Sequence, residues 1–310
     1  MSLPKTLYCG VSGWMYPHWN GIVYPKQKPR GFHALEEVAK YFDAAEINTT
    51  FYQSIRPEIA RLWMRKVEQN PKFMFTAKLG RQFTHERVTG SSEVSAFKDG
   101  LWPLLRAGKL GCVLMQFPWT FRYTQENREY LITLRRAFHE FPLVAEMRHS
   151  SWTHEEALGT LIDYHIGFAN IDQAAYTKAM PPASYLTSPI GYVRLHGRNP
   201  QDWEREFGRT TKPAPAHDYL YSPTELLEWK PRIEHLQQHA AKTFVFANND
   251  VAGKSVVNAL ELAEMLGDNR CVAPTDLIAR YPNELVHFRT ERPLQRALFN
   301  RYEPEHRAVA

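Results

Sequence analysis

Pairs of polar residues, two positions apart, recur where short apolar runs of the sequence end. Side chains two apart in a strand point to the same face, so each pair would project from one side of a strand. The side chains suited to proton transfer at these positions are Glu46, Lys78, Glu146, Asp172 and His196. Carboxylates, an amine and an imidazole can exchange protons with a substrate near neutral pH. These five are the candidate catalytic residues.

A second group of side chains near the ends of the same runs can bind a ligand through charge, hydrogen bonds or ring stacking. They are Ser12, Trp14, Asn48, Gln116, Arg148, Trp152, Arg194, Arg198, Asn248, Asn249 and Asp250. The apolar residues that alternate with the polar ones, such as Ala145, Ile171 and Leu195, are expected to face helices. The polar groups would then converge inside the mouth of a barrel.

Eight β-rich runs alternate with segments of 3.6-residue apolar periodicity, which is typical of a parallel α/β sheet. The runs cover residues 7–11, 44–47, 73–77, 112–116, 143–147, 167–171, 192–195 and 243–247. Eight β/α units favour an α/β fold with a single TIM-like (β/α)8 barrel over an open doubly wound sheet. We expect the barrel over residues 1–270 and a C-terminal extension packed on it over residues 271–310.

Prolines and loops modify this regular alternation. Pro57 predicts the start of one helix, and the patterns at 130–138 and 255–266 predict two others. Pro231 interrupts a helical pattern and predicts a break or a fresh helix start there. Residues 197–223 form a long segment between the seventh and eighth strands, so a long loop is expected at the catalytic end of the barrel.

Composition excludes several classes of protein. With 44% hydrophobic and 23% charged residues over 310 positions, the chain is of the folded rather than the disordered type. Its three cysteines lack CxxC spacing, which excludes a disulfide framework or a cysteine zinc site. Without an apolar leader or a run of about 18 apolar residues, we expect a cytoplasmic protein with no membrane association. The net charge, 38 − 33 = +5, favours anionic partners.

Taken in order, the motifs of the chain resemble those of the domain of unknown function 72 family, also called YecE-like. The resemblance covers about residues 8–266 and is carried by Gly10-Val11-Ser12-Gly13-Trp14 with Tyr16, Trp19, Gly21 and Tyr24-Pro25, by Glu46-Ile47-Asn48 with Thr50-Phe51-Tyr52, by Phe75, Lys78 and Thr84-His85, by Gln116-Phe117-Pro118 with Phe121, by Glu146-Met147-Arg148-His149-Ser150-Ser151-Trp152, by Arg194-Leu195-His196-Gly197-Arg198 and by Asn248-Asn249-Asp250. Trp119 departs from a proline that is frequent in the family, and Ala247 from an aromatic residue. The resemblance implies a TIM-barrel-like fold and a functional barrel mouth. It implies no reaction, because the activity of the family is not established.

The favoured function is binding of a small anionic, phosphate-bearing ligand at the mouth, with hydrolysis or isomerisation favoured over binding alone. Barrels often bind phosphate at the loops after strands seven and eight, where Arg198 and the helix start at 253–255 fall. Arg194 and Arg198 would hold the anion, and Lys78 would neutralise developing charge. Glu46 or Glu146 would move a proton.

Three other interpretations remain open at this stage. Basic residues with Trp14 and Trp152 could bind nucleic acid or process phosphodiesters. Glu46 and Glu146 could act as the carboxylate pair of a glycoside hydrolase. The charged residues could also form a salt-bridge network that only closes the barrel. No metal ligands are assigned, since no HExxH-like spacing occurs, and the sequence names neither a cofactor nor an oligomeric state.

Overall fold

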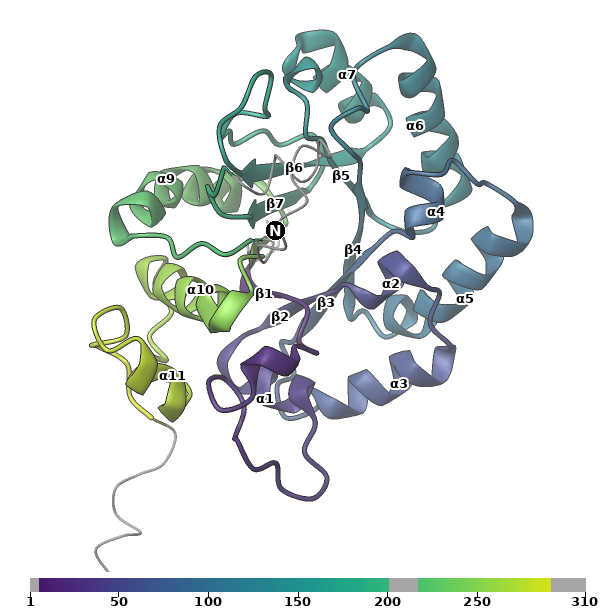
Figure 1. Ribbon diagram of the computed structural model, residues 1–310. Coiled ribbons are helices and arrows are strands. Elements are labelled where there is room, and N and C mark those ends of the chain that lie inside the picture. The colour runs from purple at the N-terminus through teal and green to yellow at the C-terminus, as the bar shows by residue number, and fades with distance from the viewer. Residues whose placement is uncertain (1–5, 201–216, 291–310) are drawn as a thin grey trace, which may run out of the picture.

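The computed structural model describes residues 6–200 and 217–290, in which eight parallel strands close into one barrel (Figure 1). The strands pair in sequence order, and β1 also pairs with β8. They are β1 (Thr6–Ser12), β2 (Ala44–Ile47), β3 (Met74–Lys78), β4 (Leu110–Gln116), β5 (Leu143–Glu146), β6 (Ile166–Asp172), β7 (Ile190–Leu195) and β8 (Lys242–Ala247). The predicted TIM-like (β/α)8 barrel is confirmed, and the open sheet is excluded.

Helices surround the strands on the outside of the barrel (Figure 1). They are α1 (Ala34–Tyr41), α2 (Thr49–Tyr52), α3 (Pro57–Lys66), α4 (Arg81–Thr84), α5 (Ser91–Arg106), α6 (Gln125–Ala137), α7 (Glu155–Asp163), α9 (Pro223–His239), α10 (Lys254–Met265) and α11 (Thr275–Arg280). The helices predicted after Pro57 and at 130–138 and 255–266 correspond to α3, α6 and α10. Within the described ranges, none of the helices has the length and apolarity of a membrane span.

Helix α9 continues through Pro231, so the predicted break is wrong. A proline inside a helix cannot donate to the carbonyl four residues earlier, here that of Leu227. Both residues are exposed, so water can hydrate that carbonyl. The N-terminus of the helix is also stabilised, because Ser222 and Glu225 form a reciprocal capping box around its first turn.

Aromatic side chains fill the interior of the barrel below its C-terminal end. Tyr8 stacks on Phe244 with ring centroids 5.0 Å apart, and the rings of Tyr192 and Phe246 lie 5.6 Å apart. All four are buried. Gly111 makes room for them, because a Cβ at this position would lie 2.3 Å from the Phe244 ring. Within the residues that the structure describes, the lower part of the barrel is thus filled by side chains.

Residues 271–290, the described part of the predicted extension, pack against the barrel. Leu277, Tyr281 and Leu285 belong to the same hydrophobic cluster as the barrel core, and α11 lies beside α10 (Figure 1). The Tyr281 hydroxyl donates to the Ala252 carbonyl at 2.9 Å. Helix α10 is buried from 255 to 263, as expected of a helix covered on two sides. Residues 201–216 of the predicted loop and 291–310 of the extension lie outside the described residues.

Gly10→Ala is expected to destabilise the barrel. A Cβ at this position would lie 2.0 Å from the Ala44 carbonyl oxygen, a backbone atom that cannot move without disturbing the pairing of β1 with β2. Overpacking of this kind costs about 1–3 kcal/mol or more. Urea denaturation measures the loss. Gly159→Ala in α7, where nothing lies within 4 Å, is the control and should be neutral or stabilising. Equal stability of the two variants would contradict the packing described.

Candidate functional site at the barrel mouth

The guanidinium of Arg194 lies buried at the centre of the C-terminal end of the barrel. Its Nη2 donates to Glu46 Oε1 at 2.8 Å, and its Nη1 donates to Glu146 Oε2 at 2.5 Å. Ser12 Oγ and Gln116 Oε1 also accept from it, each at 3.2 Å. The three charged side chains have no exposed surface. Arg194 therefore neutralises two buried carboxylates at once.

Strand geometry explains why these charges meet. Glu46, Glu146 and Arg194 come from β2, β5 and β7, which are not neighbours in the barrel, so side chains that bond one another must do so in its interior. In parallel barrels the carboxyl ends of all strands surround one opening. The two-residue spacing at the strand ends correctly indicated that these three side chains come together.

Glu46 receives two hydroxyl donors in addition to Arg194. Ser12 Oγ donates to Oε1 at 2.5 Å, and the Tyr192 hydroxyl donates to Oε2 at 2.7 Å. Thr76 lies 3.0 Å from the same tyrosine oxygen. Tyr192 is not among the candidate residues expected from the sequence. Its position two residues before Arg194, on the same face of β7, is the signal that could have found it.

Two side chains complete the surroundings of Glu146. Arg148 Nη2 lies 2.7 Å and His196 Nε2 3.2 Å from Glu146 Oε1. Burial opposes ionisation of this carboxyl, but Arg148, Arg194 and His196 outweigh it and hold the pKa of Glu146 well below its usual range. Glu146 is therefore ionised at neutral pH.

His196 is neutral and lies between Asn248, Glu146 and Arg194. Burial, reinforced by Arg148, lowers the pKa of His196 well below its usual range. Asn248 Oδ1 accepts from Arg194 at 3.1 Å, which leaves the amide Nδ2 facing His196 Nδ1 at 3.0 Å. Because an amide nitrogen only donates, Nδ1 accepts from Asn248. Nε2 lies 3.2 Å from Glu146 Oε1 and 3.4 Å from Arg194 Nη1, so the imidazole fills the space between these two charged groups.

Lys78, at the end of β3, lines a cavity of about 550 Å³ that adjoins this buried cluster. The side chain is half-buried, with Nζ 5.4 Å from the centre of the Phe51 ring. Within residues 6–200 and 217–290, no carboxylate lies within ion-pair distance of Lys78. Burial, reinforced by Arg194, lowers the pKa of Lys78 to about 8. Among the charged candidates from the sequence, Lys78 is the one that faces the cavity without an ionic partner in this part of the chain.

Asp250 and two asparagines add polar groups to the same cavity. Asn48 and Asn248 contribute to its lining. Asp250 also lines it, while its carboxylate pairs with His18 at 3.3 Å. Burial is the main cause that raises the pKa of Asp250. The cavity therefore combines an amine with a carboxyl whose proton affinity is increased.

Asp172 lies outside the barrel interior, so its predicted position in the mouth is wrong. It accepts from Trp229 Nε1 at 2.6 Å, from Tyr221 Oη at 2.9 Å and from Arg198 Nη2 at 2.8 Å. Trp229 belongs to α9, on the helix side of the sheet. In the pairing of β6 with β7, Asp172 lies beside Leu195, which faces that helix. The alternating face of β6 is therefore the reverse of the predicted one, and Ile171 points inward.

Arg198 pairs with Asp172 and, like it, lies outside the cluster around Arg194. Besides Asp172, it pairs with Glu225 at 3.4 Å and with Glu228 at 2.8 Å. Its guanidinium is therefore neutralised by three carboxylates that the described residues supply. Since Arg194 is likewise engaged by two carboxylates, neither arginine has the free charge that the sequence analysis assigned to anion binding.

Three further predicted binding residues have packing roles. Asn249 Nδ2 donates to the Tyr219 carbonyl at 2.7 Å and to Asn258 Oδ1 at 2.8 Å, away from the barrel interior. The Trp152 ring stacks on an aromatic neighbour, and its Nε1 donates to a backbone carbonyl at 2.7 Å. Trp14 borders the cavity, but its ring packs edge-on against Trp63. Aromatic residues near strand ends thus serve the core more than the ligand surface.

The helix start at 253–255 is also occupied by packing and pairing. Lys254 Nζ lies 2.5 Å from Asp218 Oδ1, and Ser255 is buried. Gly253 adopts a left-handed conformation and packs against Leu277 and Val23. The described contacts therefore give no support to a phosphate site at this helix N-terminus.

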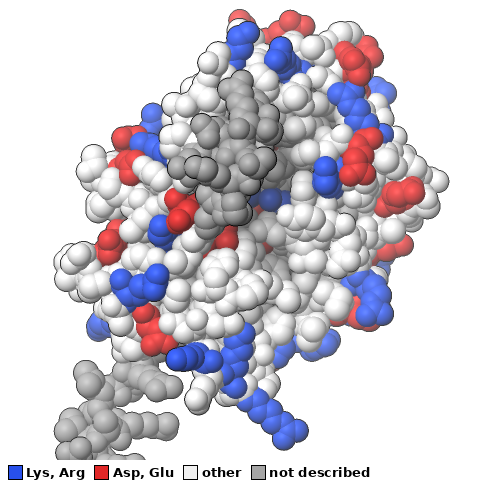
Figure 2. Space-filling model, in the orientation of Figure 1, with Lys and Arg blue, Asp and Glu red and all other residues white. Residues whose placement is uncertain are grey.

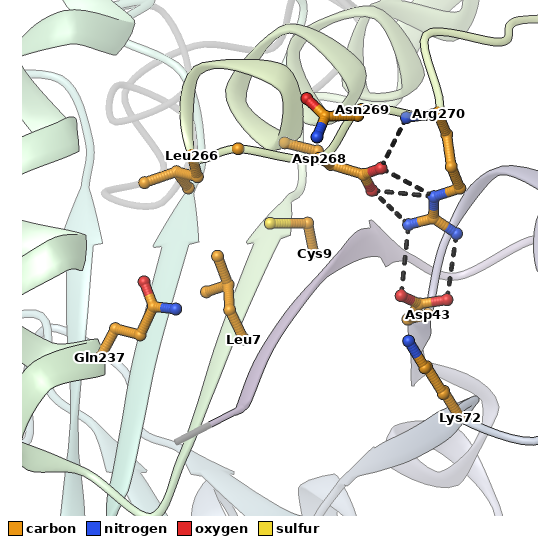
Figure 3. A pocket seen from close by; sticks show the side chains of 11 residues that line it. Leu7, Cys9, Asp43, Lys72, Gln237, Leu266, Asp268, Asn269 and Arg270 are labelled. Atoms are coloured by element: carbon orange, nitrogen blue, oxygen red, sulfur yellow. Dashed lines mark hydrogen bonds and ion pairs between the residues drawn. The ribbon is translucent and has the colours of Figure 1, made fainter. Parts of the chain in front are cut away.

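A second cavity, of about 380 Å³, lies at the opposite end of the barrel (Figure 3). Its charged residues pair with one another, because Arg270 bonds both Asp268 and Asp43. It is also lined by Leu7 and Cys9 near the start of β1. Barrel enzymes place chemistry at the C-terminal ends of the strands, so this cavity is the weaker candidate.

The surface and the carboxylates bear on the alternative functions. Figure 2 shows Lys, Arg, Asp and Glu interspersed around the face drawn, with no single basic stripe of the kind that follows a phosphate backbone. Glu46 and Glu146 have no exposed surface and share Arg194, whereas a glycosidase needs a carboxyl pair that reaches the sugar. Among the described side chains, no three His, Cys, Asp or Glu residues group as metal ligands.

Arg194→Met is expected to lower the free energy of unfolding by about 3–5 kcal/mol, because it leaves two buried carboxylates without their common cation. Chemical denaturation measures the difference. Lys78→Met is the matched control, since it removes a cation that has no ionic partner in the described structure, and its stability should equal or exceed that of the wild type. A stable Arg194→Met protein would show that the buried cluster does not depend on this guanidinium.

His196→Gln is expected to flatten the dependence of stability on pH below pH 6.5. The pKa of His196 is lower in the folded chain than its ordinary value of 6.5, so the unfolded chain binds a proton first as the pH falls. The stabilisation from His196 is therefore complete above pH 6.5 and is lost below it, by about 1.4 kcal/mol per pH unit. Denaturation between about pH 7 and pH 5 tests this. An unchanged slope in the variant would mean that folded His196 is protonated.

Comparison with other proteins places this architecture in a known family. Residues 8–280 match the model of the family described as "Protein of unknown function DUF72". The UPF0759 protein YunF of Bacillus subtilis is 29% identical over 273 residues, which cover 84% of this chain and 94% of that protein. The UPF0759 protein YecE of Escherichia coli K12 is 28% identical over 117 residues, covering 37% and 39% of the two chains.

Solved structures agree with this assignment. A DUF72 family protein from Thermotoga maritima shares 29% identity and a TM-score of 0.72, over 85% of this chain and 100% of that one. A DUF72 family protein from Enterococcus faecalis shares 27% identity and a TM-score of 0.66, over 75% and 92% of the two chains. From the family match over most of its length, the chain belongs to the DUF72 family.

Proposed function

We propose that the protein binds a small organic anion, a phosphate ester or a carboxylate, in the cavity at the barrel mouth. The observation that carries this proposal is Lys78, a half-buried cation on the cavity wall with no carboxylate partner among the described residues. An isolated cation in a site with low exposure to water attracts an anion more strongly than a surface lysine does. The anion is therefore held by Lys78 and not by Arg194 or Arg198.

The other residues that line the cavity indicate which further chemical groups the ligand carries. Asn48, Asn248 and Asp250 offer amide and carboxyl groups that bind hydroxyl or carbonyl oxygens. Met15 and Tyr52 line the rim and are 74% and 78% exposed. Large apolar side chains left exposed beside a polar cavity are typical of a ligand-binding surface. The ligand that fits combines a negative charge, polar substituents and an apolar portion.

Proton transfer, as in isomerisation, suits these residues better than hydrolysis. Asp250 lies in the cavity with a raised pKa, so its carboxyl is better able to exchange protons than an ordinary aspartate. Glu46 and Glu146, the proton carriers expected from the sequence, are held by Arg194 below the cavity and have no exposed surface. We therefore assign the proton-transfer role to Asp250.

A thermal-shift series with inorganic phosphate, a sugar phosphate, a carboxylate and a neutral sugar tests the proposal. An anion present at about 100 times its dissociation constant adds roughly 2.7 kcal/mol to the free energy of unfolding. This is enough to raise the melting midpoint by several degrees. We expect this shift in the wild type and its loss in Lys78→Met. Lys254→Met, which removes a paired lysine, should keep it.

Other outcomes discriminate against the proposal. A shift that persists in Lys78→Met would place the anion elsewhere. A shift with an oligonucleotide that disappears as salt rises would favour the nucleic-acid function instead. No shift with any anion would leave the buried charges as a structural network alone.

A further inference from the structure

The side chain of Lys78 combines two properties that suit a nucleophilic lysine as well as an anion-binding one. It lines a cavity large enough for an organic ligand, and no acidic side chain of the described structure holds it as an ammonium ion. We infer that Lys78 is a nucleophile that forms an imine with the carbonyl group of a 2-oxo acid. This inference rests on the proposed function, because it names the class of anion that the same cavity takes.

The protonation state of Lys78 suits nucleophilic attack. Desolvation, reinforced by the positive charge of Arg194, lowers its pKa from 10.5 to about 8, whereas Glu46 and Glu146 act in the opposite direction. Roughly a tenth of the side chains are then unprotonated at pH 7, against well under about one in a thousand for an ordinary lysine. Desolvation beside other cations is how enzymes activate a lysine amine.

The imine also explains why an anionic ligand and a nucleophilic lysine belong to one site. In a 2-oxo acid the carboxylate is attached to the carbonyl carbon that the amine attacks. When the imine is protonated, the positive charge stays at the former Nζ, next to that carboxylate. The ion pair between Nζ and the ligand carboxylate is therefore kept through the reaction. Lys78 can both bind the anion and attack its carbonyl carbon.

The atoms and charges balance without a redox partner. The Nζ lone pair of the neutral amine bonds to the carbonyl carbon, the C=O π bond breaks, and the nitrogen loses a proton as the oxygen gains one. The C–O bond then breaks, and the oxygen leaves as water with a second proton. Overall, the ammonium form of Lys78 and one carbonyl compound give one iminium ion and one water molecule. Asp250, in the same cavity, is the group that we assign to carry the protons.

The apolar rim indicates which 2-oxo acids fit. Met15 and Tyr52 are largely exposed beside the cavity, and about 550 Å³ exceeds what a three-carbon acid fills. A 2-oxo acid with an aromatic or branched apolar side chain would cover this rim. Phenylpyruvate is therefore a suitable probe, and phenyllactate, which has a hydroxyl in place of the carbonyl, is its matched control.

Reductive trapping tests the inference on the full-length chain. The protein is incubated with phenylpyruvate and cyanoborohydride, which reduces an imine to a stable secondary amine, and the modified peptide is identified by mass spectrometry. We expect one adduct, on Lys78, in the wild type and in Lys254→Arg. The yield at that peptide should fall at least about tenfold in Lys78→Arg, which keeps the charge and removes the nucleophile. Phenyllactate should give none.

Thermal shift on the same samples separates this inference from the proposed function. Phenyllactate should raise the melting midpoint of the wild type and of Lys78→Arg, since both keep a cation in the cavity. Stabilisation by both acids without an adduct on Lys78 would overturn the imine and leave anion binding intact. Equal labelling of other lysines would also overturn it. Absence of both stabilisation and adduct would overturn the two proposals together.

Discussion

One ionic interaction governs the C-terminal half of the barrel: a single buried guanidinium shared by two buried carboxylates. In a medium of low polarity an unpaired charge is very costly, so Arg194 requires its carboxylates and Glu46 requires Arg194, while Glu146 also pairs with Arg148. The surrounding groups follow from the same requirement. Tyr192 donates to one carboxylate, and His196 stays neutral beside the other.

The barrel is consequently layered along its axis. Aromatic rings, including Phe244 and Phe246, fill the lower interior, and the ionic layer built on Arg194 lies above them. The cavity with Lys78 comes next. The ionic layer satisfies its own charges and lies beneath the cavity, where burial, reinforced by Arg194, lowers the pKa of Lys78. The paired charges and the lysine on the cavity wall thus lie in adjacent layers.

Much of this arrangement is encoded in short-range sequence patterns. Short apolar runs predict the strand boundaries. Polar residues two positions apart at the strand ends predict the inward positions of Glu46, Glu146 and Arg194, because strand geometry is local. The same pattern misplaces Asp172, because polarity at a strand end does not fix the face of the side chain, whereas its register beside Leu195 does. That Lys78 has no ionic partner among the described residues depends on side chains from several strands, so no local sequence pattern predicts it.

The closure of the barrel by β1 and β8 has a consequence for synthesis on the ribosome. Thr6 pairs with Lys242, so the first strand emerges well over two hundred residues before its second partner exists. At about 5–20 residues per second, one edge of β1 stays unsatisfied for roughly 10–50 s. Helix α10 then needs residues 271–290 to cover its outer side. One edge of β1 therefore stays without its final partner until most of the chain has been made, so barrel closure is a late step of folding.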